Sequence, residues 1–317
     1  MGVPTIYRWD DAGAPVLDGQ SGSGVNLLRK VLVDGYGVKA AAGWTLEFLA
    51  VDENTAVFRN SATIGFGKFF RILDTDDATL CFNGRTCAVT GYETMSDLHT
   101  GLGRIPDGDA STKQYYIQKS MIIGATARPW IIIADERGFW FSFWANSTET
   151  PTEQEYNGSR MGYVGDGVPV DSLDSYFSGI FAATGINTGG IIPSKSTNDT
   201  NSIDGMSIFR DFSGTVFAPR AGLECSDYVY SFPGYSGISG AINGQYHFFR
   251  PTVTTPQTEY RPVGWLPGLY VSIHKYDTFD NFQIINDGGL QLMCFHVYQQ
   301  YGSHCQVFID ISENYRP

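Results

Sequence analysis

The chain has 317 residues and a net charge of −12, and an acidic chain of this kind repels the phosphate backbone of nucleic acids. Hydrophobic residues make up 42% of it, enough for one large domain or two smaller ones, yet no apolar run approaches the roughly 20 residues that span a bilayer. With 14% aromatic residues, 37 glycines and only 17% charged residues, the composition favours a turn-rich β protein over a typical cytosolic enzyme.

Residues 1–45 predict an extended segment, rich in glycine, proline and aromatic residues, that leads into one helix. Four apolar residues form a single helical stripe, with a serine before it and a glycine after it as the expected ends. They are Val25, Leu28, Val31 and Leu32, bounded by Ser21 or Ser23 and by Gly35. We interpret the region as a docking segment in which Tyr7, Trp9 and Trp44 are docking or packing anchors. Removing residues 1–20 should then leave a folded protein.

From residue 46 onward the pattern changes to the two-residue period of strands, and we assign a β-rich domain to 46–184. Its clearest hairpin joins Trp130–Ala134 to Phe139–Trp144 through a polar turn. The second of these strands carries three phenylalanines on one face and two tryptophans on the other. We therefore expect this strand to be buried on both sides or covered by a neighbour.

Residues 185–317 are assigned to a second β-rich region, in which 185–205 form an exposed loop or boundary because they are rich in glycine, serine, threonine and asparagine. The alternative is that both regions belong to one domain. A short helix near 171–183 is an option, and the chain closes on a hairpin formed by 290–298 and 305–311. The predicted fold class is mainly β, with β-sandwich or barrel-like sheets and one N-terminal helix.

The closing hairpin brings histidine and cysteine residues together. Cys294 and His296 share one strand face, and the turn brings His304 and Cys305 near them. Zinc accepts such nitrogen and sulfur ligands, but adjacent residues point to opposite faces of a strand, so at most three ligands could converge. Ordinary packing is the favoured interpretation. A zinc site that uses Cys294, His296 and His304, and a cross-strand disulfide, are the alternatives.

Cys81 and Cys87 flank the turn-forming pair Asn83-Gly84, so a hairpin could bring them within disulfide reach. Acidic residues cluster at 74–77 and at 107–109. We interpret both clusters as solvated turns rather than as a calcium site or a glycan-cleaving pair.

The sequence contains neither a nucleophile elbow nor a phosphate-binding glycine loop. We therefore expect no catalytic residue and no cofactor.

Several segments, in the same order along the chain, resemble structural proteins encoded in the tail-gene region of Mu-like and related tailed phages. The stretch from Tyr7 to Thr45 and the segment Arg128–Arg137 carry the more specific part of this resemblance. Looser similarity is found at Gly91–Met95, Gly162–Asp166, Gly264–Tyr270, Asp277–Phe279 and Gln306–Ile311. Residues 185–260 resemble nothing that we can name.

The resemblance implies a non-enzymatic component of a virion, in the tail, baseplate or neck, that assembles as a symmetric oligomer. Its partners would be further copies of itself and other virion proteins, with the host surface as an additional candidate. The start of the chain lacks the pattern of an export signal, so assembly in the host cytoplasm is expected.

A host-surface adhesin that stacks tyrosines on glycans is the alternative, and a glycan hydrolase is a weaker one. The tyrosines in question are Tyr228, Tyr230, Tyr235, Tyr246 and Tyr260.

Overall fold

The computed structural model describes eleven segments of the chain. They are residues 2–75, 85–105, 115–145, 159–169, 178–182, 206–209, 222–224, 246–254, 262–272, 278–298 and 304–316. The protein is mainly β, with several antiparallel sheets and one N-terminal helix, as the sequence predicts.

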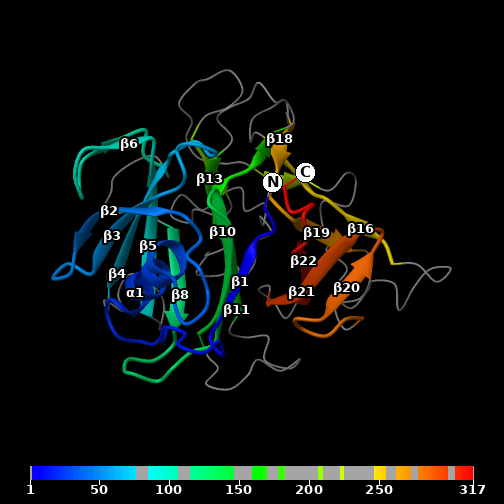
Figure 1. The fold of residues 1–317 in the computed structure, drawn as a ribbon, viewed down its shortest axis with the longest axis horizontal. Coiled ribbons are helices and arrows are strands. Elements are labelled where there is room, and N and C mark those ends of the chain that lie inside the picture. Colours follow the sequence, from blue (N-terminus) through cyan, green and yellow to red (C-terminus); the bar gives the residue numbers. More distant parts are fainter. Residues whose placement is uncertain are drawn as a thin grey trace, which may run out of the picture.

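A six-stranded antiparallel sheet forms the middle of the molecule (Figure 1). Its strand order is β1-β9-β10-β11-β13-β14, so the first strand of the chain is an edge strand of this central sheet. The strands are β1 (Thr5–Arg8), β9 (Trp130–Ala134), β10 (Gly138–Trp144), β11 (Ser159–Asp166), β13 (Ser178–Ala182) and β14 (Met206–Ile208). The predicted aromatic hairpin is confirmed as β9 and β10, paired from Phe139 with Ala134 to Phe143 with Trp130.

A five-stranded sheet and the helix lie on one side of the central sheet, at the left of Figure 1. Its strands, in spatial order, are β2 (Thr45–Ala50), β3 (Thr55–Arg59), β4 (Phe69–Thr75), β5 (Arg85–Tyr92) and β8 (Tyr115–Ser120). Helix α1 (Ser23–Arg29) continues into a π-helical turn, Lys30–Asp34, and ends at Gly35, whose φ of 77° suits glycine. A two-stranded hairpin joins β6 (Thr94–Met95) to β7 (Gly101–Leu102).

A second five-stranded sheet, at the right of Figure 1, covers the other side of the central sheet. Its order is β16 (Phe248–Phe249), β19 (Leu269–Ser272), β22 (His304–Asp310), β21 (Leu290–Tyr298) and β20 (Ile284–Asp287). A four-stranded sheet is built from β12 (Val168–Pro169), β18 (Pro262–Trp265), β17 (Thr252–Thr254) and β15 (Gly222–Glu224).

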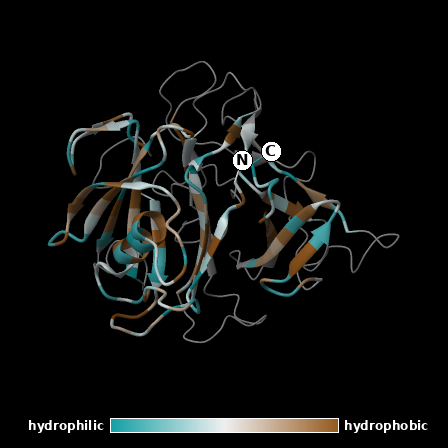
Figure 2. Cartoon of the chain, in the orientation of Figure 1, coloured by the Kyte–Doolittle hydropathy of each residue, from teal (hydrophilic) through white to brown (hydrophobic). Residues whose placement is uncertain are grey.

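Two hydrophobic cores fill the spaces on either side of the central sheet, and Figure 2 shows apolar residues along its strands. Phe139, Phe141 and Phe143 of β10 enter the core shared with α1 and the left-hand sheet. Trp140 and Trp144 enter the core shared with the right-hand sheet. All seven residues of β10 are buried. The prediction of a strand buried on both faces is confirmed, and the central sheet is the middle of three layers.

The short helix expected near 171–183 is wrong over its described part, because Ser178–Ala182 form strand β13. This strand pairs with β11, with Ile180 opposite Val164, and both of these residues are fully buried in the core. Tertiary pairing of an apolar segment against the central sheet therefore overrides its local helical pattern. Residues 170–177 lie outside the described residues, as does the predicted loop at 185–205.

The sheets cross the domain boundaries that the sequence suggests. Strand β14 follows residue 185 yet belongs to the central sheet, and β12 precedes it yet pairs with β18. Residues of the first 45, including Tyr7, Leu17 and Trp44, lie in the same core as Phe58 and Phe139. The N-terminal region is thus part of the body of the protein, which favours the alternative of one domain.

Deleting residues 1–20 is now expected to unfold the protein, which reverses the expectation from sequence. The deletion removes β1 together with Tyr7 and Leu17, both 0% exposed. Each fully buried large side chain contributes about 1.5–3 kcal/mol, out of a total stability of about 5–15 kcal/mol. Denaturant unfolding monitored by near-ultraviolet circular dichroism should show no cooperative transition for the truncated chain. Deleting only residues 1–3, where Val3 is 61% exposed, should leave the transition unchanged.

Candidate functional site

The three predicted anchors Tyr7, Trp9 and Trp44 all pack within the chain. The Tyr7 hydroxyl donates to the carbonyl of Ala40 over 2.7 Å, and Trp44 Nε1 donates to the carbonyl of Asp135 over 2.9 Å. Trp9 is half-buried, and its ring lies 6.3 Å from the Trp144 ring, centroid to centroid. These contacts are within the chain, and contact with a docking partner stays a prediction.

The predicted metal ligands are used for packing where the structure describes them. Cys294 is a buried cysteine of β21, and His296 Nε2 lies 2.7 Å from the carbonyl of Phe279 and 3.0 Å from Nε2 of Gln306. His304 belongs to β22, but its side chain is outside the described part of the structure. Among the described residues, no group of three or more histidine, cysteine or carboxylate side chains could hold a metal ion.

The predicted Cys81–Cys87 disulfide is not formed at Cys87, which is a free, buried cysteine of β5. Its thiol points into the core toward α1: a Cβ atom added to Gly24 would lie 2.4 Å from the Cys87 Sγ. Cys81 lies outside the described residues. The direction of the Cys87 side chain, away from solvent and toward the helix, is the physical reason for the free thiol.

The structure corrects the interpretation of Asp74 as part of a solvated turn. It lies in β4, its side chain is 0% exposed, and its Oδ1 is 2.7 Å from Nζ of Lys119, which is also 0% exposed. The backbone N–H of Gly24 donates to its Oδ2 over 2.7 Å. Burial raises the pKa of the Asp74 carboxyl against the opposing effect of Lys119. The acidic residues at 76–77 and 107–109 lie outside the described residues.

A second buried polar cluster joins the three layers through Asp166 and Arg316. Asp166 is 0% exposed, and its carboxylate accepts from Asn60 Nδ2 over 2.8 Å and from the backbone N–H of Phe66 over 2.9 Å. Arg316 forms a salt bridge with Asp135 and donates to the carbonyl of Asp166 over 2.6 Å. Residues from the loop after β3, from the central sheet and from the segment after β22 therefore meet at one point.

We expect the free energy of unfolding to depend on pH through the buried Asp166 carboxylate. Burial raises its pKa above the ordinary value of 3.8, and Arg137 Nε is no closer than 3.6 Å to its Oδ2. A raised folded-state pKa means that the stabilising contribution is full below the unfolded value and is lost as pH rises through the folded value. Relative to Asp166→Asn, the wild-type protein should lose stability above pH 3.8 by at most about 1.4 kcal/mol per pH unit. The measurement is the free energy of unfolding of both proteins, obtained from urea titrations at a series of pH values. If the two values changed with pH in the same way above pH 3.8, the expectation would be contradicted.

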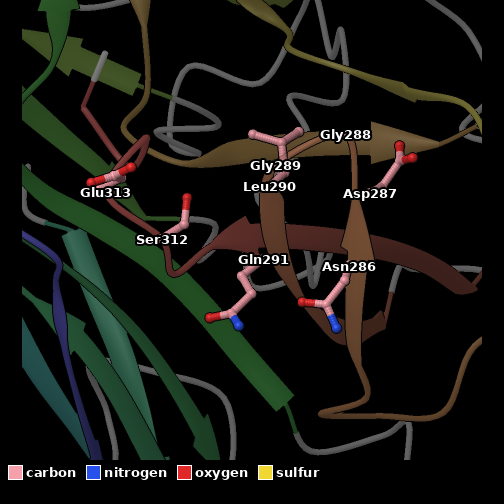
Figure 3. A pocket seen from close by; sticks show the side chains of 8 residues that line it. All are labelled: Asn286, Asp287, Gly288, Gly289, Leu290, Gln291, Ser312 and Glu313. Atoms are coloured by element: carbon pink, nitrogen blue, oxygen red, sulfur yellow. The ribbon is translucent and has the colours of Figure 1, made fainter.

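One open, shallow cleft of about 430 Å³ lies beside the turn between β20 and β21. Its lining is mostly polar: Asn286, Asp287, Gly288, Gly289, Leu290, Gln291, Ser312 and Glu313. Figure 3 shows the two carboxylates, Asp287 and Glu313, on opposite sides of it.

Among the tyrosines considered for stacking on sugars, only Tyr246 lies in the described residues. Its ring packs edge-on against Phe279 with centroids 4.6 Å apart. The Tyr246 ring therefore packs against the hydrophobic cluster of the right-hand sheet.

The comparisons with known proteins identify no relative: no protein-family model matches the sequence, and neither does any curated protein. No helix in the described part of the chain is long and apolar enough to cross a membrane.

Proposed function

We propose that this protein is a structural component of a tailed-phage virion, in the tail, baseplate or neck, and that it assembles as a symmetric oligomer. The observation that carries the proposal is the position of the segments that resemble tail-region proteins. The two more specific ones pack side by side: β1 pairs with β9, and Trp130 Nε1 donates to the carbonyl of Pro15 over 3.1 Å.

The looser segments occupy the same framework. Trp140 Nε1 donates to the carbonyl of Pro267, so the Gly264–Tyr270 segment is fastened to the central sheet. Gln306–Ile311 supply most of β22, and Val307 and Ile309 face the core beside β10. What the resemblance covers is thus a scaffold of packed strands, which supports a structural role better than a catalytic one.

Surface features support assembly with other subunits. Three consecutive apolar residues, Met121, Ile122 and Ile123, are 37%, 48% and 72% exposed. Their loop is held by the Ser120 Oγ, which donates to the carbonyl of Ile122 over 2.9 Å, and by Gly19, whose N–H donates to Gly124 O. Exposed apolar side chains on a fixed backbone suit a protein–protein contact, because little conformational entropy is lost on binding.

The test is to purify tailed particles from a strain that carries this gene and to quantify the protein in them by mass spectrometry and electron microscopy. A fixed copy number, arranged with the symmetry of the tail or neck, is the expected result. Particles that lack the protein yet are complete would overturn the proposal. Inhibition of adsorption by the isolated protein would favour the adhesin instead, and turnover of host polysaccharide would favour the hydrolase.

A further inference from the structure

The buried pair Lys119 and Asp74 has the arrangement of two groups that can react with each other. Lys119 lies on β8 and Asp74 on β4, the two strands that flank β5. The pairing places Asp74 opposite Cys87 and Cys87 opposite Ile117, so all these side chains share the face that is packed against α1. Both charged side chains are 0% exposed.

The contact between the two groups is close. Nζ of Lys119 is 2.7 Å from Oδ1 of Asp74, within the distance of a charge-assisted hydrogen bond. The other oxygen, Oδ2, is held by the N–H of Gly24. Nζ in turn donates to Ser23 Oγ over 2.9 Å and to the carbonyl of Gln20. These two acceptors can hold both protons of a neutral amine, which leaves its lone pair free to face the carboxyl group.

We propose that Lys119 and Asp74 condense to an intramolecular isopeptide bond that covalently links β8 to β4. The reaction starts with the transfer of one proton from the ammonium group to Oδ1, which converts the buried ion pair to a neutral amine and a neutral acid. The Nζ lone pair then attacks Cγ, and the new Nζ–Cγ bond forms. One N–H proton passes to the Oδ1 hydroxyl, the Cγ–Oδ1 bond breaks, and one water molecule leaves. No oxidant, reductant or activated co-reactant is required.

The surroundings favour each step. Two charges are costly to hold in a dry interior, so the neutral pair that the reaction needs is within reach. Burial raises the pKa of the Asp74 carboxyl, in the direction that favours its protonated form. The Gly24 N–H on Oδ2 can stabilise the negative charge that develops on this oxygen as the tetrahedral intermediate forms. Oδ2 then remains as the carbonyl oxygen of the amide.

Gly24 is the residue that makes the close approach possible. A Cβ atom at this position would lie 2.4 Å from Cys87 Sγ and 3.2 Å from Asp74 Oδ2. Any larger residue would push the helix away from the carboxyl group and remove the N–H that holds it. Because both reacting side chains project from strands rather than from loops, their alignment is maintained by the sheet.

The experiment is tryptic digestion of the denatured, purified full chain, followed by tandem mass spectrometry. The expected product is a branched peptide in which residues 72–85 are joined to residues 114–137, with no cleavage after Lys119, none at the Arg128-Pro129 bond, and a mass lower by one water than the sum of the two peptides. Recovery of the separate linear peptides, with cleavage after Lys119, overturns the proposal. The result does not depend on how any variant folds.

Three variants make the assignment specific. Lys119→Arg keeps a cation but should abolish the branched peptide, and its persistence would contradict the proposal. Asp74→Ala removes the carboxyl carbon that Nζ attacks and should likewise abolish the branched peptide. Lys68→Arg is the matched control, since Lys68 pairs with Glu93 at 3.5 Å elsewhere on this sheet and its replacement should leave the cross-link intact. Loss of water within one linear peptide, as at an Asp-Gly sequence, would count against the cross-link.

Discussion

Replacing Arg316 with alanine is expected to destabilise the protein by about 3–5 kcal/mol, the usual cost of breaking a buried ion pair from one side. The Arg316 side chain is 3% exposed and that of its partner Asp135 is 14% exposed. The guanidinium group also donates to the Tyr163 hydroxyl over 2.7 Å and to the carbonyl of Asp166. Without it, the Asp135 carboxylate loses its cation, and the right-hand sheet loses one of its polar connections to the central sheet.

The measurement is the free energy of unfolding from urea titration, with Arg8→Ala as the matched control. Arg8 pairs with Asp10 at 2.8 Å, but the two side chains are 35% and 49% exposed, so this pair contributes less than about 1 kcal/mol. Similar losses for the two variants would show that the Arg316 cluster does not hold the layers together. If Arg316→Ala lowered the free energy of unfolding by about 3–5 kcal/mol without changing its dependence on urea concentration, the role of the cluster in holding the layers together would be supported.

Local patterns predicted the parts of the fold that local forces decide. The helical stripe of Val25, Leu28, Val31 and Leu32 is buried in one core, as its spacing indicates. The alternation along β10 was also enough to predict that this strand is buried on both faces, because two apolar faces on one strand require two covering layers. Which elements supply those layers was not predictable, since strand order depends on contacts between distant segments.

The polar clusters could not be predicted for the same reason. Arg316 lies 181 residues from Asp135, and Gly24 lies 50 residues from Asp74. No local spacing signals such partners, and an acidic run that includes Asp74 has the composition of a turn. Position within a strand would have been the usable signal: a lysine or aspartate on the inward face of a predicted strand must be paired when buried. Cys87 follows the same logic, because its inward position makes it a packing residue.

The two buried clusters hold different interfaces, and this difference has a consequence for assembly. The Asp74–Lys119 pair fixes the helix to the left-hand sheet, whereas Asp166 and Arg316 connect all three layers. The proposed role as a virion component requires a fixed shape under load, and polar contacts that need defined geometry specify one arrangement of layers more strictly than apolar packing does. The apolar cores nevertheless carry most of the stability.

Alanine substitutions at two neighbouring positions of β10, Trp140 and Phe141, should each destabilise the protein by about 3–5 kcal/mol. The two side chains are 1% exposed and enter opposite cores. In a two-layer sandwich one of the two would face solvent, and its removal would cost little. The three-layer arrangement instead predicts large effects at both positions, measured as losses in the free energy of unfolding.

Phe249→Ala serves as the control for this pair, because Phe249 lies on the edge strand β16 and is 48% exposed. Its removal should cost no more than about 1 kcal/mol, in proportion to the smaller apolar area that it buries.

Trp140→Phe separates packing from hydrogen bonding: it keeps most of the buried ring but loses the bond from Nε1 to the carbonyl of Pro267, 2.8 Å long. An intermediate loss is expected for this variant, since the carbonyl of Pro267 would be left without that donor in a buried site. A small effect at either Trp140 or Phe141 on replacement by alanine would place that face of β10 in contact with solvent and exclude the middle position of the central sheet.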